Sequence, residues 1–417
     1  MKIISKFYNH LAGDSLYRNS IFLMASTGVM ATLGFFFWII NTRFFTPEQV
    51  GLATTLISVM TLISSFSLLG LGTGLIRFLP TSKHKNEKIN TCFTLVGLTA
   101  IFLSVIYLFG IKIFTPKLLF VRENIFFALL FVLFIAFSSL NAISESIFVA
   151  LRSNQYALIK NIVWSITKLS LPIFLVALGA YGIFMSVGIA TVLAVFLSLV
   201  FLIFKFNYLF RPAINKDVVR RMAKFSFGNY VAGFIGGLPQ LVLPIIITNQ
   251  LGPKFTAFYY MPMTIASFLY IIPQATTRSL FAEGSHSERD FGKFYGKSLI
   301  LNALLFLPAM VAVYFLGKYI LFVFGFEYAK EGTEFLQLLA ISGTFIYINS
   351  VGGVILNLRH QIQKLIVINI IGTLLILGLS YFLISKELLG IGIAWIIGNI
   401  VISGVYLFFS YSFHTNH

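Results

Sequence analysis

Residues 182–204 read GIFMSVGIATVLAVFLSLVFLIF, an apolar stretch without a charged side chain. An α-helix rises 1.5 Å per residue, so about 20 such residues cross the roughly 30 Å of hydrocarbon in a bilayer. Similar stretches recur throughout the 417 residues, of which 58% are hydrophobic and 10% charged, with a mean hydropathy of +0.92. Soluble domains carry about 25% charged residues. The composition therefore excludes an ordinary soluble protein.

Stretches of membrane-spanning length account for nearly the whole chain. We predict an all-α integral membrane protein with twelve transmembrane helices, which leaves no room for a soluble domain. The predicted helices cover residues 20–41, 50–76, 89–111, 125–151, 157–178, 182–204, 225–249, 256–277, 298–324, 333–357, 363–385 and 388–411. The single cysteine, Cys92, is interpreted as a small buried hydrophobe. Residues 1–19 carry no cleavage signal and are expected to form a cytoplasmic N-terminal segment.

The net charge of +17 is explained by membrane orientation rather than by nucleic-acid binding. Most of the 30 Lys and Arg residues lie in alternate connectors, whereas the 13 acidic residues divide about evenly between the two sides. Connectors rich in Lys and Arg stay in the cytoplasm. We therefore predict a multi-pass protein of the inner, or plasma, membrane with both termini in the cytoplasm.

Matching motifs indicate that two six-helix halves repeat each other. Residues 42–47 (TRFFTP) match residues 248–253 (TNQLGP), and three further matches follow at a nearly constant separation. These pair Leu151 and Arg152 with Leu358 and Arg359, Asn161 and Ile162 with Asn369 and Ile370, and Gly182, Ile183 and Gly188 with Gly392, Ile393 and Gly398. An even number of helices per half gives both halves the same orientation, as in some transporters.

The repeat predicts the domain organisation. A first six-helix bundle covers residues 20–204, a basic cytoplasmic linker covers residues 205–224, and a second bundle covers residues 225–417. We expect the two parallel bundles to surround a central cavity.

Two ionisable residues lie deep within predicted helices. Glu145 is about two turns from the cytoplasmic end of the fourth helix, and Lys168 is near the middle of the fifth. Charged side chains inside a bilayer are costly and mark ion pairs or functional sites. The two helices form an antiparallel hairpin, so Glu145 and Lys168 either pair and lock the hairpin or act in transport. Both interpretations stay open.

Further polar side chains follow helical spacing in the second half. Asn229 and Gln240 lie on nearly one face of the seventh helix, and Tyr270, Gln274 and Arg278 form a stripe along the eighth. Close helix packing for the seventh helix and interface anchoring for Arg278 are the alternative interpretations.

Two arginines complete the candidate substrate cavity. Arg43 lies at the outer end of the first helix and Arg77 at the inner end of the second, where interface anchoring also explains them. Cations outnumber acids among all the candidates, which suits an anionic ligand. The candidate set is Arg43, Arg77, Glu145, Lys168, Asn229, Gln240, Tyr270, Gln274 and Arg278.

Signals for enzymatic or metal chemistry are weak. Residues 292–298 (GKFYGKS) are one residue short of a phosphate-binding loop and lead into a membrane helix. His414 and His417 lie on a terminal tail without a third ligand. We expect no catalytic residue, metal or cofactor, and leave open a coupling to a proton or sodium gradient.

Four motifs resemble one family. Residues 43–51 (RFFTPEQVG), 70–80 (GLGTGLIRFLP), 225–228 (FSFG) and 251–259 (LGPKFTAFY) are similar to helix-end motifs of the Wzx-type polysaccharide and O-antigen flippases. That family shares a superfamily with multidrug extruders and lipid II flippases. The resemblance implies two bundles that move an isoprenoid diphosphate-linked oligosaccharide from the cytoplasmic to the outer leaflet by alternating access, for assembly of lipopolysaccharide O-antigen or another surface polysaccharide.

The resemblance also implies partners and an alternative function. Besides the lipid-linked oligosaccharide and the bilayer, polysaccharide polymerase or assembly proteins are candidate partners, and nucleic acid is not. A cation-coupled multidrug antiporter of the same superfamily is the alternative, with Glu145 as the ion carrier. The first helix contains no Asp or Glu, and this absence favours the lipid-linked sugar.

Overall fold

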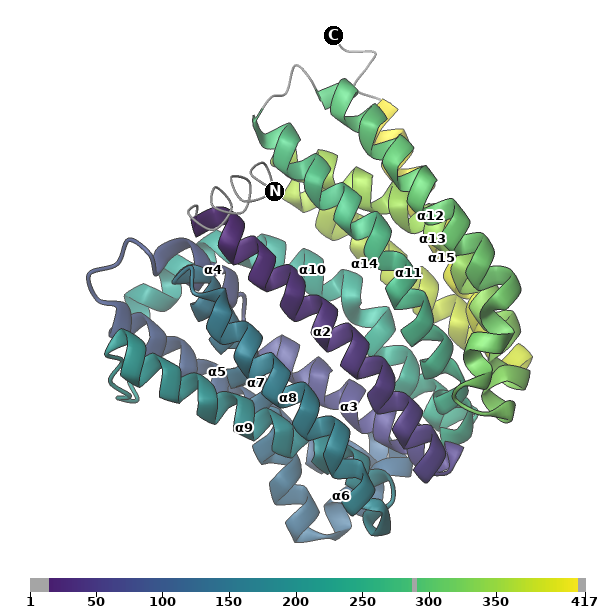
Figure 1. Ribbon diagram of the computed structural model, residues 1–417, viewed down its shortest axis with the longest axis horizontal. Helices are drawn as coiled ribbons and strands as arrows, with labels where there is room; N and C mark the ends of the chain where they lie inside the picture. The colour runs from purple at the N-terminus through teal and green to yellow at the C-terminus, as the bar shows by residue number, and fades with distance from the viewer. Residues whose placement is uncertain (1–14, 287–290, 412–417) are drawn as a thin grey trace, which may run out of the picture. The chain divides into compact units, whose positions relative to one another are not determined.

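The computed structural model describes residues 15–286 and 291–411, and the regular elements in these ranges are all helical (Figure 1). The long helices are α2 (Ser15–Phe44), α3 (Pro47–Ser67), α5 (Lys85–Phe114), α7 (Ile125–Ala150), α8 (Asn154–Phe174), α9 (Ala180–Phe206), α10 (Lys216–Gln250), α11 (Pro253–His286), α12 (Phe291–Phe322), α13 (Phe326–Leu358), α14 (Ile362–Phe382) and α15 (Glu387–Tyr411). The short elements are α4 (Leu71–Phe78), α6 (Leu119–Glu123) and the 3₁₀ turns η1 (Pro116–Leu118), η2 (Val176–Leu178) and η3 (Ile384–Lys386).

Twelve helices in the described ranges are long and apolar enough to cross a membrane. This confirms the predicted all-helical, twelve-span membrane class. His414, His417 and residues 1–14 of the predicted N-terminal segment lie outside the described residues. The cytoplasmic position of the termini stays a prediction.

Most helix bounds differ by a few residues from the predicted ones, and α11 ends at His286 rather than at residue 277, while α12 and α13 begin at Phe291 and Phe326 rather than at residues 298 and 333. Three other differences change the organisation of the chain. The predicted second helix is broken into α3 and α4 because Leu69 and Gly70 take left-handed backbone angles, with φ of 52° and 75°. Glycine adopts such angles without a steric penalty, so Gly70 provides the break. The first helix begins earlier than predicted, at Ser15, and α10 begins at Lys216, inside the predicted linker. The non-helical linker is therefore only residues 207–215.

The chain divides into two compact units. Unit 1 holds residues up to 45 and 56–230, and unit 2 holds residues 46–55 and those from 231 onward. The predicted division differs because the start of α3 belongs to unit 2 and the first half of α10 belongs to unit 1. Gly51 explains the first difference, since a Cβ there would overlap the carbonyl of Pro253 at the start of α11.

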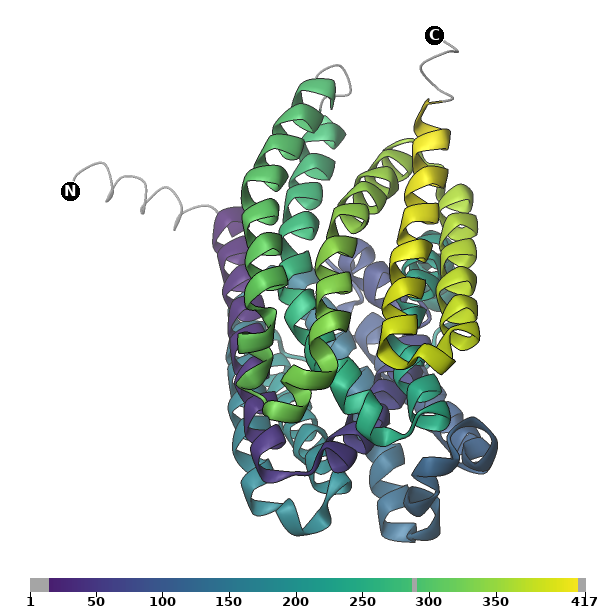
Figure 2. The ribbon, with the colours of Figure 1, turned by 90° about the vertical axis from the view of Figure 1, so that its right-hand side faces the viewer.

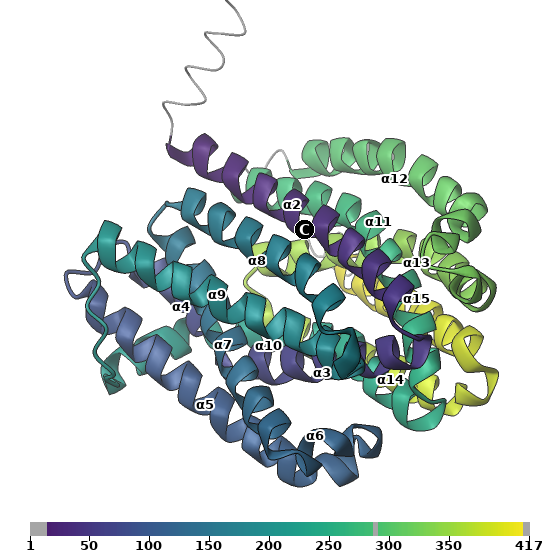
Figure 3. The ribbon, with the colours of Figure 1, turned by 60° about the horizontal axis from the view of Figure 1, so that its bottom comes forward.

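Unit 1 is a row of packed helices. In turn, α2 packs on α8, α8 on α9, α9 on α7, and α7 on α5 and α4 (Figure 3). Its core at the end near the linker contains Leu75, Phe93, Ile147 and Met222, all buried. Tyr208 of the linker is buried in the same core and donates to Asn90 Oδ1 of α5 at 2.5 Å. The linker is therefore packed against its own unit rather than fully solvated.

Unit 2 is built around α13. This helix packs on α11, α12 and α15, while α14 packs mainly on α15 (Figure 2). Small residues allow the close approaches, because a Cβ at Gly343 would overlap Phe306 of α12 and one at Gly398 would overlap Ile376 of α14. Packing of this kind holds helices together where the surrounding solvent is itself apolar.

One local structure recurs in both units at a constant separation of 208 positions. Helix α8, turn η2 and the start of α9 correspond to α14, η3 and the start of α15. Gly179, directly before α9, and Glu387, the first residue of α15, have nearly the same φ, 54° and 53°. Gly182 therefore corresponds to Gly390 rather than to Gly392 as predicted. The recurrence supports the repeat in these segments, while the relation between complete halves stays a prediction.

Candidate substrate sites

Unit 1 contains a buried charged cluster between α7 and α8. Lys160 Nζ lies 2.9 Å from Glu145 Oε2, and the Lys160 side chain is 0% exposed whereas that of Glu145 is 36% exposed. The same ammonium donates to Asn141 Oδ1 at 2.7 Å and to Ser144 Oγ at 3.0 Å. Lys160 thus has acceptors for all of its protons, which offsets the cost of burying its charge.

The second oxygen of the carboxylate joins a third helix to the cluster. Asn161 Nδ2 lies 3.1 Å from Glu145 Oε1 and 2.9 Å from Ser26 Oγ of α2. Glu145 is therefore held from two sides and its charge is balanced by Lys160. The Glu145 side chain remains partly exposed, but its negative charge is already compensated by the ammonium of Lys160.

A pair between Glu145 and Lys168 is wrong, because the partner of Glu145 is Lys160. In an antiparallel hairpin that turns at residues 151–153, a residue near the end of α7 faces a residue near the start of α8. Lys168 is eight residues further along α8 than Lys160, which is about 12 Å at 1.5 Å per residue. Lys160 lies in the first turn of the predicted fifth helix, where a cation is expected at the membrane surface, so its position did not indicate a buried partner for Glu145.

Lys168 is a buried cation of a different kind. It is 8% exposed, and its Nζ lies 3.8 Å from the centroid of the Trp164 ring and 5.3 Å from that of Phe37 on α2. Among the described residues, no carboxylate pairs with it and no hydrogen bond to its Nζ is formed. The Trp164 indole donates to Thr191 Oγ1 of α9 at 3.0 Å and is thereby oriented. Aromatic faces stabilise a cation but leave its charge uncompensated.

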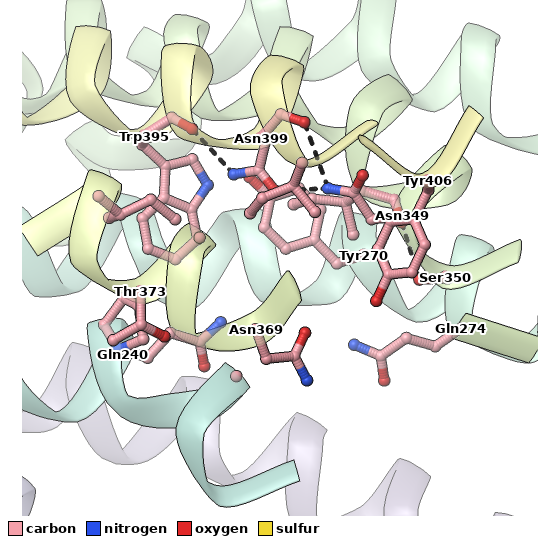
Figure 4. Close-up of a pocket in the computed structure, with 16 residues that line it drawn as sticks. Gln240, Tyr270, Gln274, Asn349, Ser350, Asn369, Thr373, Trp395, Asn399 and Tyr406 are labelled. Carbon is pink, nitrogen blue, oxygen red and sulfur yellow. Dashed lines mark hydrogen bonds between the residues drawn. The ribbon is translucent and has the colours of Figure 1, made fainter. Parts of the chain in front are cut away.

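Unit 2 contains a cavity of about 260 Å³ among α10, α11, α13, α14 and α15 (Figure 4). Three predicted residues, Gln240, Tyr270 and Gln274, line it. The rest of the lining consists of Gly236, Pro239, Ile346, Asn349, Ser350, Asn369, Gly372, Thr373, Ile376, Trp395, Asn399, Ile402 and Tyr406. No lining residue carries a charge, and five of them are Asn or Gln.

Internal hydrogen bonds hold one wall of the cavity. Asn349 Nδ2 donates to Asn399 Oδ1 at 3.0 Å, and Asn399 Nδ2 donates to the Trp395 carbonyl at 2.8 Å. Ser403 donates to Asn349 Oδ1 at 2.8 Å, which completes the network. The Tyr270 hydroxyl contacts the Leu339 carbonyl at 2.7 Å. These side chains are fixed before any ligand arrives.

Other polar groups of the cavity are without partners. The side-chain carboxamides of Gln240 and Gln274 and the Tyr406 hydroxyl form no hydrogen bond with another described residue. The buried Trp395 Nε1 lies beside the Tyr270 hydroxyl but forms no hydrogen bond with a described residue. In Figure 4 the side chains of Gln240, Asn369 and Gln274 lie in a row opposite Trp395, Asn399 and Tyr406, and Asn369 itself donates to the Ala232 carbonyl at 2.8 Å. An open cavity with unused donors and acceptors is suited to a polar ligand.

The remaining predicted residues do not line the cavity. Arg43, Arg77, Asn229 and Arg278 are exposed. Arg77 lies 6.0 Å from the centroid of the Phe225 ring, within unit 1. Their roles as substrate contacts stay predictions.

The sequence analysis missed several residues of both sites. Asn349, Trp395, Asn399 and Tyr406 were passed over because uncharged residues in apolar helices give little signal. The separation of 208 positions is a signal for one of these residues, because it pairs Asn349 with Asn141, the residue beside Lys160. By the same separation Asn369 corresponds to Asn161, and Lys168 of α8 corresponds to the uncharged Ile376 of α14, which lines the cavity.

The helices and the two sites define a class of protein, a multi-pass membrane protein with polar and charged side chains inside its spans. The family model for polysaccharide biosynthesis proteins matches residues 16–272, which is more than half of the chain. The chain belongs to this family, which confirms the predicted relation to polysaccharide exporters.

One curated relative points in the same direction. Over 177 residues the chain is 27% identical to a Shigella flexneri protein provisionally named an O-antigen transporter. The match covers 41% of this chain and 42% of the relative, so it spans about two fifths of that relative's length.

Solved structures of transporters share the fold at low identity. The lipid II flippase MurJ in an inward closed conformation superposes with a TM-score of 0.78 at 17% identity, over 94% of this chain and 87% of that one. An inward-facing multidrug resistance MATE family transporter of the MOP superfamily superposes with a TM-score of 0.70 at 15% identity, over 91% of this chain and 93% of that one. A MOP superfamily transporter from Pyrococcus furiosus superposes with a TM-score of 0.64 at 15% identity, over 95% of this chain and 94% of that one. The chain therefore has the MATE and MurJ fold.

Proposed function

We propose that this protein is a flippase that moves an isoprenoid diphosphate-linked oligosaccharide from the cytoplasmic to the outer leaflet by alternating access. The family and the fold support a transporter in polysaccharide biosynthesis. The observation that carries the specific proposal is Lys168, a buried cation without an acidic partner among the described residues. Such a charge inside a membrane helix is expensive unless a ligand compensates it.

A diphosphate is a suitable compensating group. It brings negative charge and several acceptor oxygens, and charge-assisted hydrogen bonds are about twice as strong as neutral ones. The rings of Trp164 and Phe37 hold the ammonium in place until the anion arrives. The protein would therefore contribute binding and orientation, without breaking or forming a covalent bond.

The cluster around Glu145 disfavours the alternative of a cation-coupled drug antiporter. A carrier of protons, sodium or cationic drugs needs a carboxylate with available negative charge. Glu145 is already paired with Lys160 and bonded to Asn161. A multidrug antiporter would have to break this pair in every cycle, and Lys160 is fully buried in the unit.

Transport in proteoliposomes tests the proposal. An isoprenoid diphosphate oligosaccharide is placed in one leaflet, and its movement is scored by cleavage with an added glycosidase. We expect movement by the native chain and a loss of about tenfold or more in Lys168→Ala, because a charge-assisted contact contributes about 1.5–3 kcal/mol. Lys168→Arg retains the charge and should keep part of the rate.

The controls separate charge from folding. Lys112→Ala removes an exposed lysine near the end of α5 and should flip the lipid at the native rate. Gel filtration in detergent shows whether each variant is folded. Native transport in Lys168→Ala would remove the observation that carries the proposal. Export of a cationic dye, combined with no movement of the lipid-linked sugar, would favour the antiporter.

A further inference from the structure

We infer that the cavity of unit 2 is a subsite for one uncharged sugar unit of the transported glycan, and that it rejects acidic sugars. This inference rests on the proposed function and deepens it, since it names the class of sugar. Its starting point is the neutral lining of the cavity, in which amide, hydroxyl and aromatic groups replace the lysines of unit 1.

The unused polar groups match the chemistry of sugar hydroxyls. Each hydroxyl both donates and accepts, and the carboxamides of Gln240 and Gln274 offer both a donor and an acceptor. The Tyr406 hydroxyl adds a third group of this dual kind, and the Trp395 indole adds a donor. A sugar unit would satisfy these groups at once, whereas an aliphatic ligand would leave them desolvated and unpaired.

The aromatic lining supplies the apolar part of the contact. A pyranose ring has one face made largely of C–H groups, which packs on an aromatic ring. Trp395 is 5% exposed and Tyr406 is 4% exposed, and both line the cavity. The network of Asn349, Asn399 and Ser403 fixes the backbone and side chains around Trp395. The wall is therefore preorganised, which reduces the ordering cost of binding.

The volume of the cavity limits what enters. At about 260 Å³ it lies below the roughly 300–1,000 Å³ that is usual for pockets of drug-sized ligands. One sugar ring fits this volume and a long glycan does not. The rest of the glycan must therefore lie outside the cavity.

The absence of a charged residue from the lining explains why the cavity selects neutral over acidic sugars. A uronic acid would bring a carboxylate among lining residues that include no Lys, Arg or His. An unpaired buried charge is far more costly than an unpaired neutral group. In unit 1 the position equivalent to Ile376 holds Lys168, so one unit is equipped for an anion and the other for a neutral ligand.

Ligand binding to the complete chain in detergent tests the inference without transport. The probes are soluble glucose, galactose, mannose, rhamnose and their N-acetylhexosamine counterparts, each compared with the matching uronic acid where one exists. Saturation-transfer NMR measures the contact of each probe with the protein. We expect at least one neutral sugar to bind, with its uronic acid at least about tenfold weaker.

Variants of the lining assign the signal to the cavity. Gln274→Ala should weaken binding of the neutral sugar, and Lys112→Ala should leave it unchanged. Ile376→Lys introduces the cation of unit 1 and should admit the uronic acid, while Ile376→Met is its uncharged control. Gln274→Lys places a cation at an exposed lining position and replaces Ile376→Lys if that variant does not fold.

The outcomes distinguish this inference from the proposed function. Equal or tighter binding of uronic acids, or no binding by any neutral probe, would overturn the inference. Transport by the native chain of lipid-linked glycans made only of acidic sugars, at the rate of neutral ones, would overturn it as well, while supporting a flippase. Selective binding of neutral sugars without lipid transport would support the subsite and contradict the flippase.

Discussion

Two lysines on one helix have different surroundings, and the difference predicts different roles for them. Lys160 is paired with Glu145 and bonded to Asn141 and Ser144. Lys168 is covered by aromatic rings and has no acid among the described residues. Removing Lys160 should therefore affect stability first, and removing Lys168 should affect transport first.

A double-mutant cycle tests the structural role of the Glu145–Lys160 pair. Glu145→Gln should lower the free energy of unfolding by about 1–3 kcal/mol, because it leaves the ammonium of fully buried Lys160 without its counter-charge. Lys160→Met should cost less, since Glu145 is partly exposed and can be hydrated. The combined variant should be more stable than the sum of the two single changes predicts.

Equilibrium unfolding in mixed micelles measures these free energies. Strictly additive losses would show that the two side chains are not coupled. The exposed pair of Lys254 and Glu327, 3.0 Å apart, is the matched control and should show a coupling energy near zero.

A tight turn leads from α8 into α9 and from α14 into α15, the helix pairs that carry Lys168 and part of the unit 2 cavity. Gly182 and Gly390 lie where a Cβ would overlap the carbonyl of Leu175 and Leu383 respectively. These contacts set how α8 leads into α9 and how α14 leads into α15. The Lys168 segment and the wall of the unit 2 cavity depend on these helix pairs.

Alanine substitutions test this requirement. Gly182→Ala and Gly390→Ala should each destabilise the protein by about 1–3 kcal/mol, because the added methyl group meets backbone that cannot move aside. Gly378→Ala on α14 is the control, since nothing lies within 4 Å of a Cβ there. It should be neutral or slightly stabilising, because alanine is the better helix former. Thermal unfolding in detergent measures all three, and equal behaviour of Gly378→Ala and Gly390→Ala would contradict the steric explanation.

At the scale of the whole molecule, the distribution of Lys and Arg predicts which connectors face the cytoplasm. Lys83 lies in the connector between α4 and α5, and Lys330 lies near the start of α13. Both side chains are exposed. The positive-inside rule places Lys83 in the cytoplasm and Lys330 on the outer side. The native Cys92 is fully buried, so the chain offers a silent background for cysteine labelling.

Cysteine labelling tests the topology. In bacterial spheroplasts, a membrane-impermeant maleimide should label Lys330→Cys and should leave Lys83→Cys unlabelled until the membrane is opened. The native chain should remain unlabelled in both conditions. The reverse pattern would invert the orientation, and with it the direction of transport in the proposed function.

Much of the fold was predictable because membrane insertion depends on local composition. About 20 apolar residues specify a spanning helix wherever they occur, so the twelve spans follow from sequence alone. The break at Gly70 and the start of α10 inside the predicted linker were not predictable in this way. They depend on backbone angles and on packing against residues distant in the sequence.

Composition, periodicity and short motifs were enough to predict the membrane class, the twelve spans, the family and three residues of the unit 2 cavity, Gln240, Tyr270 and Gln274. Only the tertiary structure decided that Glu145 pairs with Lys160, that Lys168 is left with aromatic rings, and that Trp395 and Asn399 complete a neutral cavity. The physical reason is that helical periodicity gives the face on which a residue lies, whereas its partner depends on the rotation and offset of the neighbouring helix. The two lysines are eight residues apart, so a shift of about 12 Å along α8 exchanges one for the other.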